Sequence, residues 1–268
     1  MNTLRCDAVV FDFDGVLVES VDVKTRAFAL LYEPYGPEVV NKVVAWHLEH
    51  GGISRYEKFR HFHQVFLGRP LPAAEEAQLA DRFSALVEEA VIAAAWIPGA
   101  REFLEGWHAR LPLYVASGTP EDELVRIIGR RGMSGYFAGV AGAPRRKGEI
   151  LRDFLGRGNV PPERMLMVGD AMTDYVGAKE AEVPFLGIAP VGASPFPTGV
   201  DVLPDLTRFA GFLTDNSTVS LQPVLGRPVL NIVGRVRLKG TFRFSGMKGH
   251  LSFQGEEGFF RAVENRDR

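Results

Sequence analysis

The amino-acid sequence predicts an α/β fold in which a parallel sheet carries helices on both faces. In residues 1–19 and 97–213, short apolar runs typical of buried strands alternate with helix-like segments. Residues 20–96 interrupt this alternation with helical periodicity and contain no convincing strand. Residues 214–268 change again, to alternating apolar and basic residues. We therefore expect an α/β core, an all-helical insert and a C-terminal β-like extension.

The composition limits the classes of function. A chain of 268 residues that is 46% hydrophobic can bury a full core and one smaller unit. The net charge of −2 argues against general nucleic-acid binding by the whole protein. A single cysteine, Cys6, excludes an internal disulfide framework and suits a reducing compartment. With no signal-like stretch and no bilayer-length apolar run, we expect a cytoplasmic protein without a membrane partner.

The first predicted strand, residues 8–11, ends in two carboxylates. Asp12 and Asp14 follow it directly, and the carboxyl ends of parallel strands form the edge at which ligands bind. Gly15 suggests that the chain then turns, leaving one side chain and one backbone carbonyl for a cation. Crowded acids repel each other and call for a counter-ion, and hard oxygen ligands suit Mg²⁺. An ordinary strand followed by an Asp-Gly turn explains the same residues equally well.

The helical insert contains one segment with an unusual charge distribution, residues 51–58. Ser54 and Glu57 have the spacing of a capping box, which would be purely structural. Arg55 and Lys58, however, are cations in a first helical turn, where they oppose the helix macrodipole. They are better explained by an anionic substrate, although a solvated basic face remains an equal alternative.

Histidines and aromatic residues are frequent in the insert. Without accompanying thiols, the histidines do not favour a zinc site, and we expect them at the surface. The aromatic residues fall at helical spacing and are expected to form the core of the insert. The histidines are His47, His50, His61 and His63, and the aromatic residues are Trp46, Phe59, Phe62 and Phe66.

The second apolar run, residues 113–116, leads into a hydroxyl and a glycine. Ser117 and Gly118 precede an acidic helix start, and a strand-end hydroxyl beside a helix N-terminus suits phosphate oxygens. An ordinary helix cap would account for the same residues. Lys147, just before an amphipathic segment, would by itself be a surface lysine.

The third apolar run, residues 165–168, leads into two further acids. Asp170 follows the run, and Asp174 comes four residues later. This spacing brings both carboxylates to one side of a turn that enters a helix. Strand and helix patterns then continue through residues 185–188 to about Phe212.

The C-terminal extension has a different character. Residues 231–244 alternate apolar and basic side chains, which predicts half-exposed strands, with a hairpin broken near Gly240. From residue 221 onward, nine Lys and Arg face four Asp and Glu, so this segment carries a charge near +5 (9 − 4). It could cover a sheet edge, bind a protein partner, self-associate through β-addition, or bind an anionic partner. Nucleic-acid binding is not favoured, because no clear aromatic platform or recognised motif accompanies the charge, and the sequence does not decide among these uses.

The order of these motifs resembles the haloacid dehalogenase-like hydrolase superfamily over the first four-fifths of the chain. The first motif, Asp14–Ser20, is most similar to the phosphoglycolate phosphatase and β-phosphoglucomutase branch. The resemblance implies a Rossmann-like catalytic core in residues 1–19 and 97–213. It also implies a helical cap in residues 20–96, whose Gly-x-Ser-Arg segment resembles the loop that grips a distal phosphate or carboxylate. Residues 214–268 lie outside the resemblance.

The resemblance also implies roles for individual residues. Asp12 matches the nucleophile that becomes an aspartyl phosphate. Asp14 matches the general acid and base, with its backbone carbonyl on the metal. Ser117 and the Gly118 amide match the groups that hold the phosphate.

The remaining matches concern charge neutralisation and metal binding. Lys147 matches the cation that neutralises the nucleophile and the phosphoryl group. Asp170 matches a Mg²⁺ ligand, and Asp174 matches an acid that binds or orients the metal. Because Gly148 stands where the family often has proline, Arg146 is a rival for the role of Lys147.

These observations predict a Mg²⁺-dependent phosphatase that hydrolyses a small phosphorylated metabolite. A sugar phosphate or a phospho-acid such as phosphoglycolate is favoured by the basic segment of the insert. A phosphomutase of the β-phosphoglucomutase type would use the same residues and remains an alternative. A non-enzymatic phospho-receiver, or a scaffold acting through the extension, fits the motifs less well.

Overall fold

The computed structural model describes residues 6–214, 219–224, 227–232, 250–254 and 261–265. The chain divides into two compact units, Met1–Thr214 and Asp215–Arg268. Among the described residues, no helix combines the length and the apolar character needed to cross a bilayer.

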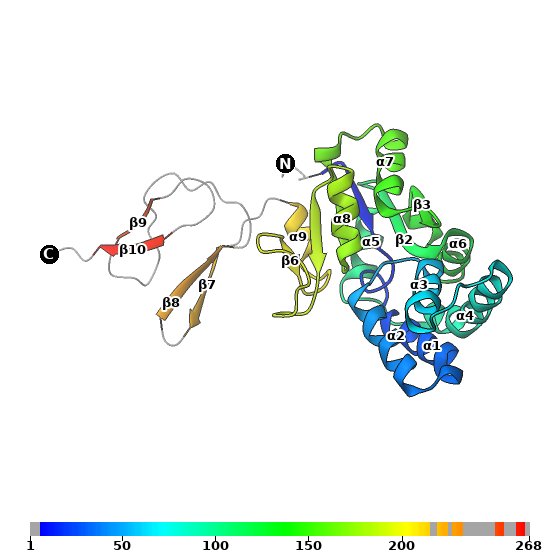
Figure 1. Cartoon of the computed structure of the whole chain (residues 1–268). Coiled ribbons are helices and arrows are strands. Elements are labelled where there is room, and N and C mark those ends of the chain that lie inside the picture. The colour runs from blue at the N-terminus through cyan, green and yellow to red at the C-terminus, as the bar shows by residue number, and fades with distance from the viewer. Residues whose placement is uncertain (1–5, 215–218, 225–226, 233–249, 255–260, 266–268) are drawn as a thin grey trace. The chain divides into compact units, whose positions relative to one another are not determined.

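Within the first unit, six strands form a parallel sheet in the order β3-β2-β1-β4-β5-β6 (Figure 1). They are β1 (Ala8–Phe11), β2 (Leu113–Pro120), β3 (Gly139–Ala143), β4 (Met165–Gly169), β5 (Phe185–Ile188) and β6 (Val202–Leu203). In the register of the sheet, Phe11 pairs with Val115 of β2 and with Val168 of β4. The carboxyl end of β1 therefore lies between those of β2 and β4, as the motif order predicts.

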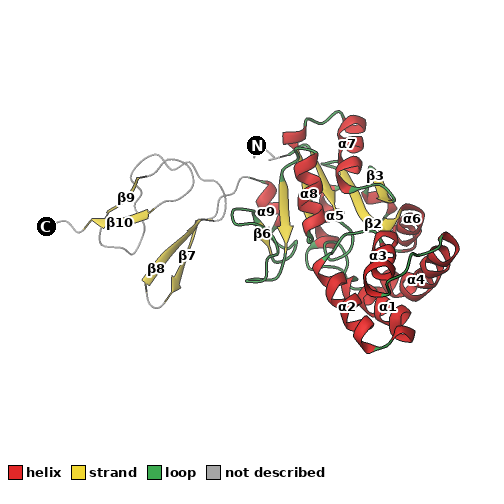
Figure 2. Ribbon diagram, in the orientation of Figure 1, coloured by secondary structure: helices red, strands yellow, loops and turns green. Residues whose placement is uncertain are grey.

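Helices cover both faces of this sheet, which confirms the predicted Rossmann-like fold (Figure 2). They are α5 (Ala100–Trp107), α6 (Glu121–Arg130), α7 (Lys147–Gly158), α8 (Met172–Glu180) and α9 (Phe209–Leu213). Side chains of β1 alternate between the faces. Val9 and Phe11 pack into a core with α5, α6 and α9, whereas Ala8 and Val10 pack into a second core with α7 and α8.

The insert between β1 and β2 is helical, as its periodicity predicts, and its helices lie together in Figure 1. They are α1 (Val21–Tyr32), α2 (Pro37–Glu49), α3 (Arg55–His61) and α4 (Ala73–Ala93). Short helical turns occur in the insert at Glu33–Tyr35 and Phe62–Phe66, and in the core at Ser134–Tyr136 and Pro162–Arg164. As expected, Phe59 and Phe62 are buried in the core of the insert, and Trp46 and Phe66 pack against it.

Two predictions about the insert are wrong. Ser54 precedes α3 but makes no capping hydrogen bond, because its hydroxyl is buried without a partner and Glu57 is exposed. His47 and His63 are buried rather than exposed, because both rings pack against aromatic residues of the insert. The His47 ring lies 4.7 Å from that of Phe28.

In the second unit, the described residues form two antiparallel strand pairs. β7 (Val219–Val224) pairs with β8 (Arg227–Ile232), and β9 (His250–Gln254) pairs with β10 (Arg261–Asn265). The β-like character expected of the extension is therefore present. The predicted break near Gly240 lies outside the described residues.

Candidate active site

Three carboxylates meet at the carboxyl edge of the sheet. Asp12 follows β1, Asp170 follows β4, and Asp174 lies in the first turn of α8. Oxygen atoms of the three side chains lie within 4.8 Å of one another. Gly15, at φ +78°, lets the chain turn beside them, where a Cβ would overlap the carboxylate of Asp170. The predicted turn at Gly15 is thus formed, and it lies against Asp170, which is distant in the sequence.

Lys147 is the cation of this cluster. Its Nζ lies 2.8 Å from Asp12 Oδ1 and 2.6 Å from Asp174 Oδ1, and it donates a hydrogen bond to the carbonyl of Ala116 at 2.7 Å. Lys147 is the first residue of α7 and is buried, whereas the rival Arg146 is exposed. The structure therefore places Lys147, and not Arg146, beside Asp12.

The acids outnumber this cation, and their pKa values show the imbalance. Burial raises the pKa of Asp12 to about 7, although the neighbouring Lys147 opposes the rise. Burial, Asp12 and Asp174 together raise the pKa of Asp170 well above its ordinary value. Burial lowers the pKa of Lys147, but Asp12 and Asp174 outweigh it and the net change is upward.

This donor set fits a divalent metal ion. Three carboxylates facing one ammonium leave the cluster negative, and their oxygen atoms are the ligands that Mg²⁺ prefers. A bound cation would favour the ionised form of each acid. Asp12, Asp170 and Asp174 are therefore the described side chains suited to hold it.

Asp14 lies apart from this cluster and has its own partners. It accepts hydrogen bonds from Ser20, from Lys24 and, at 3.2 Å, from Thr119. Burial raises the pKa of Asp14, but the ion pair with Lys24 outweighs it and holds the pKa below its usual value. Sequence reasoning missed Lys24; the available signal was a cation in the first helix of the insert, ten residues after Asp14.

Ser117 and Gly118 lie beside Asp14 at the end of β2. The buried Ser117 hydroxyl lies 3.4 Å from Asp14 Oδ2 and accepts a hydrogen bond from the Thr119 amide at 3.1 Å. Gly118 lines the pocket and lies against the backbone of Gly52 in the insert. The predicted phosphate-holding pair is thus close to the acids.

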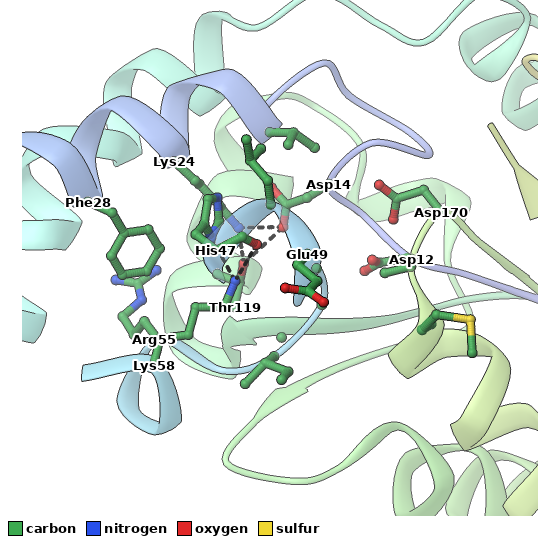
Figure 3. A pocket seen from close by; sticks show the side chains of 18 of the residues that line it. Asp12, Asp14, Lys24, Phe28, His47, Glu49, Arg55, Lys58, Thr119 and Asp170 are labelled. Carbon is green, nitrogen blue, oxygen red and sulfur yellow. Dashed lines mark hydrogen bonds and ion pairs between the residues drawn. The ribbon is translucent and has the colours of Figure 1, made fainter. Parts of the chain in front are cut away.

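A cavity of about 160 Å³ is lined by Asp12, Asp14, Gly118 and Asp170, and by Glu49, Arg55 and Lys58 of the insert. In Figure 3, Asp12 and Asp170 lie on one side of it, Arg55 and Lys58 on the other, and Asp14 between them. The cavity is small beside the roughly 300–1,000 Å³ of pockets for drug-sized ligands. Its size therefore suits a short ligand.

The two predicted substrate-binding cations differ in their surroundings. Arg55 donates to both carboxylate oxygens of Glu123, at 2.5 and 2.9 Å, and to the Ser84 hydroxyl at 2.8 Å. Its guanidinium also lies 4.5 Å from the ring centroid of Phe83. Arg55 is therefore neutralised by the protein itself, and the pair joins α3 of the insert to α6 of the core.

Among the described residues, no carboxylate forms an ion pair with Lys58. Its Nζ lies 2.7 Å from Nδ1 of His47, and the side chain is only 2% exposed. Sequence reasoning missed both His47, expected at the surface, and Glu123, an acid in an ordinary acidic helix start.

The family model for haloacid dehalogenase-like hydrolases matches residues 6–182. The chain therefore belongs to the haloacid dehalogenase-like hydrolase family. A comparison with curated proteins found no match.

Solved structures resemble the chain over about three-quarters of its length. CbbY from Rhodobacter sphaeroides in complex with phosphate has 23% sequence identity and a TM-score of 0.60, covering 76% of this chain and 96% of that chain. A CbbY mutant was solved with xylulose-1,5-bisphosphate. A predicted phosphoglycolate phosphatase from Haemophilus somnus has 18% identity and a TM-score of 0.61, covering 78% and 98% of the two chains. YfnB from Bacillus subtilis, bound to magnesium, has 18% identity and a TM-score of 0.59, covering 78% and 99%. These identities support a common fold.

Proposed function

We propose that this protein is a Mg²⁺-dependent phosphatase that hydrolyses a small phosphomonoester through an aspartyl phosphate on Asp12. The observation that carries the proposal is the position of Asp12, which lies beside Lys147 and two further carboxylates at the edge of the sheet. Membership of a hydrolase family supports it, as do relatives solved with phosphate and with magnesium. Residues 1–19 and 97–213 would form the catalytic core, and residues 20–96 the cap.

In the first step, an oxygen of Asp12 attacks phosphorus, and the substrate oxygen leaves with a proton from Asp14. Ser117 and the Gly118 amide hold the phosphoryl oxygens, and Lys147 neutralises part of the charge that gathers on them. Mg²⁺, held by Asp12, the Asp14 carbonyl, Asp170 and Asp174, would supply further positive charge when bound.

In the second step, Asp14 takes a proton from water, which attacks the aspartyl phosphate. The carboxylate of Asp12 is restored and inorganic phosphate is released. The ion pair with Lys24 holds Asp14 ionised, so the arrangement seen here suits the proton-accepting step.

The test is phosphate release from a panel of sugar phosphates, phosphoglycolate, nucleotides and an aryl phosphate, with Mg²⁺ and with EDTA. We expect release that requires the metal and favours a small substrate. Isomerisation of a sugar phosphate without phosphate release would instead establish the mutase alternative. The absence of both phosphate release and isomerisation across the panel would contradict both enzymatic proposals.

Asp12→Asn provides the mechanistic check. Asparagine preserves the shape of the side chain but lacks the carboxylate nucleophile, so we expect kcat to fall by about 10⁴-fold or more. Because Lys147 keeps Asp174 as a partner, the variant should fold, as circular dichroism would show. Retained turnover would remove Asp12 from the nucleophile role.

A further inference from the structure

Two helices from different parts of the first unit lie side by side, α4 of the insert and α6 of the core (Figure 1). Midway along them, Arg126 pairs with Glu88 at 3.1 Å, and Arg130 pairs with Glu89. The side chains of these pairs lie at least partly in water, where an ion pair contributes little to stability. The contacts at the two ends of the helix pair therefore matter more for how the insert is held on the core.

At the C-terminal end of α4, one arginine of the core holds the returning chain. Arg131, directly after α6, donates hydrogen bonds to the carbonyls of Val91, Ile92 and Ala94, at 2.9, 2.6 and 2.9 Å. Its guanidinium also lies 5.0 Å from the ring centroid of Trp96. Carbonyls at the end of a helix lack partners within the helix, and Arg131 supplies them. This end of the insert is therefore attached firmly to the core.

The outgoing and returning segments of the chain also meet at this end. The Glu19 amide donates a hydrogen bond to the Ala95 carbonyl at 2.9 Å, and the Ile97 amide donates one to the Leu17 carbonyl at 3.0 Å. The insert is thus joined to the core by two backbone segments that are hydrogen-bonded to each other. A movement of the insert as one body would turn about this paired connection.

The other end of the helix pair, beside the cavity, contains a buried ion pair. Arg55 and Glu123 are only 4% and 3% exposed, and the Ser84 hydroxyl donates to the Glu123 carboxylate at 2.5 Å. Arg55 lines the cavity, whereas Glu123 is not among the residues that line it. Bidentate pairing of an arginine with a carboxylate is stronger and more directional than an ordinary hydrogen bond. Because Arg55 belongs to the insert and Glu123 to the core, the pair can form only when the insert lies against the core.

We propose that Glu123 is a positioning residue, which acts through Arg55 to hold the insert closed over the cavity, with the paired connection as the pivot. In the closed arrangement each charge neutralises the other. Loss of one charge leaves the other buried alone, which is costly, and turning the insert away returns the lone charge to water. Closure also keeps Gly52 against Gly118, one of the predicted phosphate-holding groups. The inference rests on the proposed function only in its kinetic consequences.

Distances between spin labels measure the position of the insert without any turnover. Lys42→Cys on α2 and Glu163→Cys before β4 place labels at exposed positions of the full-length protein, because the native Cys6 is buried. We expect Glu123→Gln to lower the ratio of closed to open molecules about 10- to 100-fold, the value of a hydrogen bond to a charged group, and so to add a second distance. Glu89→Gln, the same substitution in an exposed pair, is the matched control and should keep the wild-type distribution. An unchanged distribution in Glu123→Gln would overturn the proposal.

Two further variants separate the ion pair from general damage to the fold. Arg55→Met combined with Glu123→Gln leaves no lone charge, so this double variant should return most molecules to the wild-type distance. Arg55→Lys keeps the charge but loses the bidentate geometry, and it should give an intermediate distribution. A double variant that is more open than Glu123→Gln would show that the two residues act independently, and would contradict the proposal.

Kinetics provide a readout that distinguishes positioning from substrate contact. Because Glu123 does not line the cavity, its substitution should act through the closed fraction alone. We expect Glu123→Gln to raise KM by up to the factor by which the ratio of closed to open molecules falls, equally for every small substrate, with kcat little changed. A loss confined to one substrate, or a lower kcat at unchanged KM, would contradict positioning. If no phosphomonoester is hydrolysed, the proposed function fails, and the distance measurements still decide the role of Glu123.

Discussion

At the scale of single residues, Lys147 has the greatest influence on the charge of the candidate active site. It contacts both Asp12 and Asp174 from a buried position. Lys147→Met would leave two buried acids without their cation, and breaking a buried pair costs about 3–5 kcal/mol. We expect a lower free energy of unfolding in urea and a kcat reduced by at least about 10²-fold.

Arg146→Met is the control for this prediction, because Arg146 is adjacent in sequence but exposed. It should retain both activity and stability. A Lys147→Met enzyme with wild-type kcat, or an Arg146→Met enzyme without activity, would reverse the assignment of the cation.

A second prediction concerns how Lys58 affects the pH dependence of the free energy of unfolding. The pKa of Lys58 is about 7 in the folded protein, whereas its ordinary value is 10.5. Between pH 7 and pH 10.5, the Lys58 side chain is therefore protonated in the unfolded chain but not in the folded protein. Stability due to Lys58 therefore rises with pH across this window and is lowest below pH 7. Lys58→Met lacks this penalty, and its gain in unfolding free energy over the wild type should be largest below about pH 7 and shrink toward about pH 10.

The groups that influence Lys58 remain in this variant. Lys24, Asp14 and Asp170 are unchanged, and His47 stays neutral throughout the window because its pKa is about 3. Denaturant titrations at several pH values measure the effect, with Lys42→Met as the exposed control. A pH-independent difference between the Met variant and the wild type would contradict the low pKa of Lys58.

The sequence predicts some of these residues better than others. Asp12 directly follows one apolar run and Asp170 follows another after Gly169, so a strand pattern is enough to place both at one edge. The pairing of Arg55 with Glu123 joins residues 68 positions apart, and no local pattern indicates which acid a cation will meet. Burial of His47 likewise depends on how the helices pack.

At the scale of elements, the insert contacts the core beside the cavity. Gly118, after β2, lies so near the insert that a Cβ there would overlap the carbonyl oxygen of Gly52. Thr173, at the start of α8, donates a hydrogen bond to the Gly51 carbonyl at 2.9 Å. Periodicity predicts the helices of the insert, but this contact depends on tertiary packing.

Gly118→Ala should therefore displace the loop at Gly52, because a rigid backbone atom must move to admit the methyl group. We expect kcat/KM for the preferred substrate to fall at least about tenfold, since small misplacements of binding groups are costly to catalysis. Gly135→Ala, where nothing lies within 4 Å of the added Cβ, is the control and should behave as the wild type. Full activity in Gly118→Ala would show that the loop moves freely.

At the scale of the whole molecule, the chain divides after Thr214 into the unit that holds the candidate active site and the C-terminal unit. The first unit ends with α9, whose Phe209 and Leu213 are fully buried in its core. The carboxylates, Lys147, Lys58 and His47 all belong to this first unit. The family match also ends before the extension, at residue 182.

A chain truncated after Thr214 should consequently fold and retain its catalysis. It keeps α9 and with it the apolar surface that this helix buries, so we expect the melting temperature of the first unit and kcat/KM on the preferred substrate to match those of the full-length protein. A chain that ends before Phe209 is the control. It lacks large buried side chains, and the loss of one buried aromatic side chain lowers the free energy of unfolding by about 3–5 kcal/mol, so this unit should be destabilised. If truncation after Thr214 abolished activity while preserving the melting temperature, the extension would contribute to the catalytic site itself. An unchanged kcat/KM would confine the role of the extension to partners or self-association, which sedimentation of the two chains would then distinguish.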